Sequence, residues 1–251
     1  MRSQLTLTVA ESKRLIAKGV ANLDVVKSAM SSGLIAISYG STNAYVAEEL
    51  LGKEIEKERY LTGHTLPAKF DKSGKKRGSR IPTFIFKDGQ VALDMDLNTA
   101  LADMKKGDVF IKGANALNYQ RGVAGILIGD SKGGTIGNAI GHIVGRRIRL
   151  VIPISLEKCV AFDIDEIAET LSETCQDERG DIPRLMAVRG DIITEIEALR
   201  VLAGVQAMHI ASGGIGGAEG GVRLIIEGHK EAVDKAIGIV EEIQGEARFF
   251  S

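Results

Sequence analysis

The stretch GLIAISYGSTNAYVAEEL, residues 33–50, places an apolar strand, a polar turn and a helix in direct succession. Its segment LIAI is continuously apolar, which is typical of a strand buried on both faces. A turn before a helix favours anion binding, because free N–H groups and the helix dipole attract phosphate or carboxylate there. The alternative is that Ser41 only caps the helix. The candidate ligand-binding residues of this turn are Gly40, Ser41, Thr42 and Asn43.

Composition narrows the class of protein. The chain has 251 residues, 44% of them hydrophobic and 26% charged, which is ordinary for a globular protein with a full core. A formal net charge of -1 gives no overall attraction to nucleic acid or to a membrane. Cys159 and Cys175 lie outside any CxxC or Cys/His cluster, so we expect reduced thiols, no metal site and no cofactor. The chain shows no signal peptide and no run of membrane-spanning length, so we expect a cytoplasmic protein.

Short apolar strands alternate with helices through most of the chain. Strands are expected at 108–112, 126–128 and 148–154, and helices at 97–105, 135–146 and 163–174. This alternation predicts an α/β fold, with a mainly parallel sheet covered by helices on both faces. Ligands bind such sheets at the carboxyl ends of the strands. We therefore expect the loops at 40–43, 113–118 and 129–134 to converge.

The pattern changes after Pro183. Strands are expected at 185–188, 205–211, 222–227 and 246–250, with helices at 192–202 and 231–243. This β-α-β-β-α-β order is that of a small ferredoxin-like α+β module. The polar segment CQDERGDIPR precedes it, so the sequence predicts an α/β domain over 1–178 and a C-terminal module over 179–251. Small ferredoxin-like modules often pair through an apolar sheet face, so we expect a homo-oligomer.

Three segments in order resemble ribose-5-phosphate isomerase. They are GLIAISYGSTNAYVAEELLG, DVFIKGANALN, and SKGGTIGNAI followed by RRIRLVIPISLEKCV. Together they cover roughly residues 9–160 and are similar to the wider superfamily of sugar-phosphate isomerases and CoA transferases. The resemblance implies the parallel-sheet fold and a phosphorylated ligand.

The chain also departs from that family. The isomerases carry acidic residues in the Gly-Ala turn, where this chain has Asn115 and Ala116 with Lys112 before them. The family's catalytic glutamate follows the Lys-Gly-Gly loop, but residues 135–149 here contain no acidic residue. Aldose–ketose isomerisation needs a base that removes a proton next to a carbonyl. We therefore expect a protein that is not a ribose-phosphate isomerase, and no nucleophilic glutamate of a CoA transferase is evident.

Two more loops supply candidate residues. The amides of Asn115 and Asn118 can bind ligand hydroxyls, although asparagine also stabilises turns through its own backbone. A lysine and two glycines before a helix can cradle a phosphate, although the spacing is not that of a Walker motif. The candidates in this second loop are Lys132, Gly133, Gly134 and Thr135. If the protein is an enzyme, the acid–base candidates are Lys112, Asp130 and His142.

Three other features have open interpretations. The basic loop at 69–80 is a solvated loop or a lid over an anion, and it lacks the aromatic residues that stack on nucleic-acid bases. The glycine-rich loop at 212–221 is a flap or a plain hairpin tip, and His64 is a second-rank site candidate. The sequence thus favours binding or sensing of a small anionic, phosphorylated metabolite. The alternative is an enzyme of altered chemistry on a sugar phosphate, nucleotide or CoA ester.

Overall fold

The computed structural model describes residues 1–63, 65–67, 69, 78–173, 175, 177 and 179–249. A six-stranded sheet has the order β10-β8-β5-β2-β3-β4. Its strands from β10 to β2 are parallel, and β3 and β4 are antiparallel. The prediction of an α/β fold with a mostly parallel central sheet is confirmed. The strands are β2 Leu34–Ile37, β3 Ile85–Lys87, β4 Gln90–Val91, β5 Val109–Ile111, β8 Arg149–Pro153 and β10 Asp191–Ile193.

Helices cover both faces of this sheet, because alternate side chains of a strand point to opposite faces. Ile35 and Val109 pack in one apolar cluster with the first three helices, whereas Leu34 and Phe110 pack in a second cluster with the next two. The first group is α1 Val9–Ala21, α2 Asp24–Ser32 and α3 Ser41–Leu51, and the second is α4 Leu97–Asp103 and α5 Gly134–Arg146.

A separate antiparallel sheet precedes the loop at 129–134, which the sequence predicted at the edge of the parallel sheet. β6 (Ala116–Asn118), β7 (Val123–Ile128) and β9 (Arg184–Val188) pair in the order β6-β7-β9, with α6 (Ile164–Ser172) packed against them. The loop at 129–134 therefore follows a strand of this second sheet. The expectation that it lies at the carboxyl edge of the parallel sheet is wrong, because β6 and β7 form a hairpin that diverts the chain.

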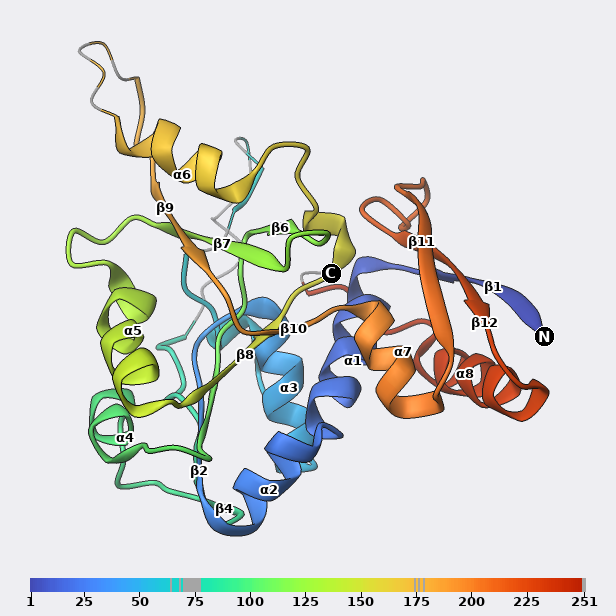
Figure 1. The fold of residues 1–251 in the computed structure, drawn as a ribbon, viewed down its shortest axis with the longest axis horizontal. Coiled ribbons are helices and arrows are strands. Elements are labelled where there is room, and N and C mark those ends of the chain that lie inside the picture. Colours follow the sequence, from blue (N-terminus) through green and yellow to red (C-terminus); the bar gives the residue numbers. More distant parts are fainter. Residues whose placement is uncertain are drawn as a thin grey trace.

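The C-terminal sheet corrects the predicted ferredoxin-like order. Its strands run β1-β12-β11, all antiparallel, and β1 (Arg2–Leu7) comes from the N-terminus. The predicted strand at 185–188 is present as β9 but pairs with β7, and residues 246–249 form no strand. The other elements of this unit are α7 Glu195–Ala203, β11 Gln206–Ser212, β12 Val222–Glu227 and α8 Lys230–Ile243. In Figure 1 this unit lies on the opposite side of the molecule from β6, β7 and β9.

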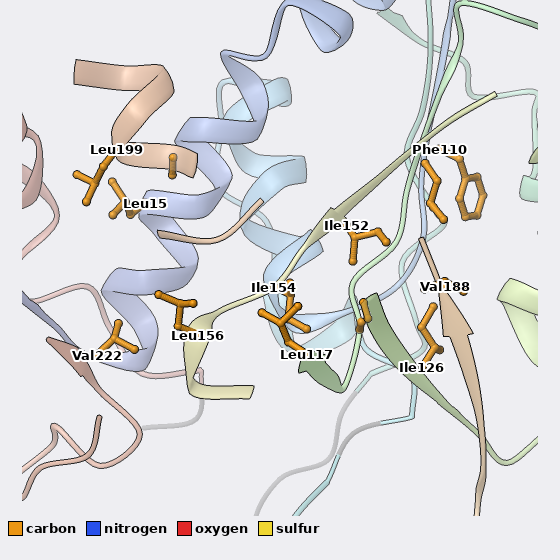
Figure 2. Packing of buried hydrophobic residues seen from close by; sticks show 14 of the residues in the cluster. Leu15, Phe110, Leu117, Ile126, Ile152, Ile154, Leu156, Val188, Leu199 and Val222 are labelled. Carbon is orange, nitrogen blue, oxygen red and sulfur yellow. The ribbon is translucent and has the colours of Figure 1, made fainter. Parts of the chain in front are cut away.

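One apolar core joins the units. Leu15 and Leu199 belong to the same buried cluster as Phe110, Ile126 and Val222, as Figure 2 shows. Strands β9 and β10, which follow the predicted boundary at 178/179, pair with strands that precede it. The domain boundary stays a prediction. Within the described residues, no helix combines the length and apolar character needed to cross a membrane.

Candidate functional site

The candidate site is a cavity of about 580 Å³ at the carboxyl ends of β2 and β5. This is the edge at which parallel sheets hold their ligands. The walls come from segments far apart in the sequence, including the C-terminal tail. We call it the main cavity. The lining residues are Lys13, 39–43, 61–63, 65–67, 112–115, Leu127, Lys158, Arg248 and Phe249.

The N-terminus of α3 forms one wall of the main cavity. The N-cap is Gly40, and no side chain in the described residues caps the helix. Ser41 is the first helical residue, so the interpretation of Ser41 as the cap is wrong. The first turn of α3 also carries no acidic side chain. An uncapped helix N-terminus presents N–H groups and a positive partial charge, which together attract an anion.

Asn43 ties this helix to the sheet edge. Its buried Nδ2 donates to the Ser38 carbonyl oxygen at 2.9 Å and to Ser38 Oγ at 3.2 Å. Its Oδ1 is buried, with no hydrogen-bond partner among the described residues. Buried polar atoms are nearly always hydrogen-bonded, so an acceptor without a donor at the cavity wall is unusual. Asn43 thus fixes the start of the helix to the end of β2.

Three lysines converge on the main cavity, and we call Lys13, Lys112 and Lys158 the lysine cluster. Lys112 follows β5, and its Nζ donates to the Gly113 carbonyl oxygen at 3.1 Å. Lys158 closes the short helix η2 (Leu156–Lys158), and its Nζ donates to the Ala114 carbonyl oxygen at 2.9 Å. The two amines therefore hold consecutive carbonyl groups of one turn. Within the described residues, neither amine forms a salt bridge with a carboxylate.

Burial lowers the pKa of all three lysines. It lowers the pKa of Lys112 to about 8, with a further contribution from the charge of Lys158. Burial also lowers the pKa of Lys158, and Glu157 opposes this only in part. The pKa of Lys13 falls for the same reason, against the attraction of Glu157. The lysine cluster therefore carries desolvated positive charge that an incoming anion would stabilise.

The Lys132 loop lies outside the main cavity. Its N–H groups are already occupied, because Asp130 Oδ1 accepts from the N–H of Lys132 at 2.8 Å and of Gly134 at 3.3 Å. A carboxylate of the protein thus sits where a phosphate would bind. The sequence-predicted residues that do not line the main cavity are Asn118, Asp130, Lys132, Gly133, Gly134, Thr135 and His142.

The two asparagines of the β6–β7 hairpin differ in position. Asn115 lines the main cavity, and its Oδ1 accepts from the Leu127 N–H at 3.0 Å. Asn118 Oδ1 accepts from the Arg121 N–H at 3.2 Å within the hairpin turn. Both amides therefore stabilise the hairpin, and of the two only Asn115 also faces the main cavity.

The C-terminal tail supplies cavity residues that the sequence did not indicate. Gly245 N–H donates to Glu11 Oε1 at 2.9 Å, which fixes the tail against α1. The tail then brings Arg248 and Phe249 to the main cavity, where Lys13 Nζ lies 5.6 Å from the Phe249 ring centroid. No local pattern predicts this, because the contact depends on how the C-terminal unit packs on α1.

The other loops that the sequence analysis singled out lie in different parts of the structure. Residues 61–63 and 65–67 line the main cavity, whereas His64 and residues 70–77 of the basic loop lie outside the described residues. The glycine-rich loop contacts the rest of the chain: a side chain at Gly220 would meet Glu157 Oε2 at 2.8 Å. Within the described part of the chain, no three His, Cys, Asp or Glu side chains are grouped as a metal site would require.

Comparisons with protein-family models, with curated proteins and with solved structures gave no match to this chain. The site must therefore be interpreted from its own chemistry. Its described lining offers amines, a guanidinium group, hydroxyls, two amides and a helix N-terminus, and no carboxylate.

Proposed function

We propose that the protein binds a small anionic metabolite in the main cavity, with the anion between the α3 N-terminus and the lysine cluster. One observation carries the proposal: three desolvated amines without a salt-bridge partner in the described residues line a cavity at an uncapped helix N-terminus. Burying unpaired positive charge is unfavourable, so a protein that keeps three such amines together gains most when an anion is bound.

The size and lining of the main cavity support a small, partly apolar ligand. A volume of about 580 Å³ lies within the usual range for small-molecule sites. Leu61, Leu66 and Phe249 add apolar side chains to the lining, beside the polar groups of the turn at 40–43. A phosphorylated metabolite matches this division, because its phosphate can meet the cations while its carbon skeleton contacts the apolar side.

The same lining supports our proposal that the protein is a divergent member of the sugar-phosphate isomerase and CoA transferase superfamily. The main cavity occupies the sheet edge that the resemblance implies, but its described lining contains no carboxylate to serve as the base of an isomerase. We therefore propose binding without ribose-phosphate isomerisation. The C-terminal unit would serve assembly or regulation, since its tail contributes Arg248 and Phe249 to the site.

A thermal-denaturation screen tests the proposal. Sugar phosphates, nucleotides, CoA esters and carboxylic acids would each be added at pH 7, and a ligand at a hundred times its dissociation constant stabilises by about 2.7 kcal/mol. At least one of these anions should raise the melting temperature of the wild type. The stabilisation should fall by about half or more in Lys158→Met and be kept in Lys132→Gln, which removes an exposed lysine outside the main cavity. If no anion stabilises the wild type, the proposal is wrong.

A homo-oligomer stays part of the proposal. β11 is an edge strand, and its Met208 and Ile210 side chains are exposed. Light scattering after gel filtration would give the mass in solution, and a monomer across the concentration range would remove this part without affecting the binding site.

A further inference from the structure

Lys112 has a different environment from the described lysines that form salt bridges. Lys57 is paired with Glu48 at 3.0 Å, and Lys230 with Asp234 at 2.6 Å. Lys112 instead faces a cavity, hydrogen-bonds only a carbonyl oxygen among the described residues, and has a second amine beside it. Two amines held on consecutive carbonyls of one turn repel each other when both are protonated, so one of them is readily neutral.

The backbone fixes where the Lys112 amine can reach. The Lys112 N–H donates to the Val151 carbonyl oxygen at 3.0 Å, which extends the β5–β8 pairing to this residue. The residue thus stands at the end of a buried strand on a rigid base. Its neighbours in the main cavity, Lys158 and the α3 N-terminus, can bind an anion while the Lys112 amine faces the remainder of the ligand.

We propose that Lys112 is an amine nucleophile that forms an imine with the aldehyde or ketone group of an anionic metabolite, the anion being held by Lys158 and the α3 N-terminus. This inference rests on the proposed function, because the same cavity must bind the anion. A neutral lysine beside a second cation in a desolvated pocket is the arrangement that activates lysine toward carbonyl compounds.

The step balances without any further reactant. The neutral amine adds to the carbonyl carbon, a C–N bond forms, and the C=O π bond breaks to give a carbinolamine. The two hydrogens of the amine leave with the carbonyl oxygen as water, and a C=N bond remains. No oxidant or reductant is consumed. A pKa of about 8 raises the neutral fraction of Lys112 at pH 7 by more than about a hundredfold over an ordinary lysine.

Reductive trapping tests the inference with the full-length protein. The probe is glycolaldehyde phosphate, which carries an aldehyde and a phosphate on two carbons, and borohydride reduces any imine to a stable amine. Peptide mass spectrometry should find the mass of the probe less one oxygen atom on Lys112. At pH 7 the modification of Lys112 should be at least about tenfold faster than that of the exposed Lys132.

Two variants and a pH series separate the inference from general lysine reactivity. Lys112→Arg keeps the positive charge but cannot form the imine, so it should lose the cavity adduct while phosphate still raises its melting temperature. The rate at Lys112 should rise with pH and level off above about 8, whereas surface lysines continue to gain up to their ordinary pKa. Lys132→Arg is the matched control and should retain the Lys112 adduct.

The outcomes distinguish the two proposals. Phosphate stabilisation without a preferential Lys112 adduct overturns the imine and leaves anion binding intact. A preferential Lys112 adduct that forms equally fast with neutral glycolaldehyde supports the nucleophile and contradicts the anion site. If phosphate does not stabilise the protein and Lys112 is not preferentially modified, both proposals are wrong. Modification spread evenly over the surface lysines, without stabilisation by phosphate, has the same meaning.

Discussion

Arg14 and the lysine cluster are both partly buried, but their electrostatic environments are opposite. Arg14 on α1 is surrounded by carboxylates, with N···O distances of 2.6 Å to Glu48, 3.0 Å to Glu49 and 2.9 Å to Glu246. Burial alone would lower the pKa of Arg14, but its hydrogen bonds to these carboxylates outweigh burial and raise it. The lysine cluster has comparable burial and no salt-bridge partner in the described residues, and its pKa values fall. The contrast separates a cation that is paired within the fold from cations that have no salt-bridge partner among the described residues.

The largest expected effect is at Arg14. Arg14→Leu leaves three carboxylates, including the almost fully buried Glu48, without their shared cation. Loss of one partner from a buried ion pair typically destabilises by about 3–5 kcal/mol. Urea denaturation at pH 7 would measure this, with Lys230→Ala as a control that removes an exposed pair. A loss below about 1 kcal/mol would show that the Arg14 network does not hold the tail against α1.

The next effect is the pH dependence of anion binding. An anion binds more tightly when Lys112 is protonated. The affinity should therefore be highest below the pKa of about 8 and decrease as the pH rises through it. The decrease between pH 7 and pH 9 should approach about tenfold. Sulfate is a suitable probe because its own charge is constant in this range. Calorimetry in two buffers at pH 8 should detect proton uptake on binding, and uptake that persists in Lys112→Met would assign it to another group.

The lysine cluster should reduce the stability of the free protein. Lys158→Met removes a desolvated amine and keeps an apolar side chain of similar length, so the free energy of unfolding at pH 7 should rise. The unfolded state binds more protons than the folded one above the lowered pKa, so this gain should shrink at higher pH. Urea curves at pH 7 and pH 9.5 measure both changes. A destabilised Lys158→Met would mean that the amine is part of the structural framework.

The smallest effect is expected in the loop that only resembles an anion site. Asp130→Ala removes the acceptor for the N–H groups of Lys132 and Gly134, and loss of such a hydrogen bond typically destabilises by about 1 kcal/mol. Anion affinity should not change, because this loop does not line the main cavity. A change in affinity, measured by the same sulfate titration, would place the loop functionally with the main cavity.

The sequence predicted the part of the site that is local. A continuous apolar strand followed by a glycine turn and a helix was enough to place Ser41 at the carboxyl edge of the parallel sheet. The same logic failed for Lys132, because it assumed that the strand before it belongs to the parallel sheet. The hairpin β6–β7 is formed by short apolar segments whose sheet membership depends on pairing with β9, which is distant in sequence.

The remaining site residues come from tertiary packing. Lys13 and Lys158 are ordinary lysines in sequence, and only their desolvation in the main cavity distinguishes them. Arg248 follows a helix of the C-terminal unit and reaches the site because the tail packs on α1. The predicted C-terminal strand order failed for a related reason, since β1, with only Leu5 and Leu7 buried, was not recognised as a strand that pairs with β12.

The most direct test of the central claim is a calorimetric titration of inorganic phosphate into three proteins at pH 7. The account predicts saturable binding to the wild type, the same affinity in Lys132→Gln, and at least about tenfold weaker binding in Lys158→Met, since one charge-assisted contact contributes about 1.5–3 kcal/mol. Equal binding to the wild type and Lys158→Met, or no binding to the wild type, would contradict the claim that the lysine cluster is an anion site.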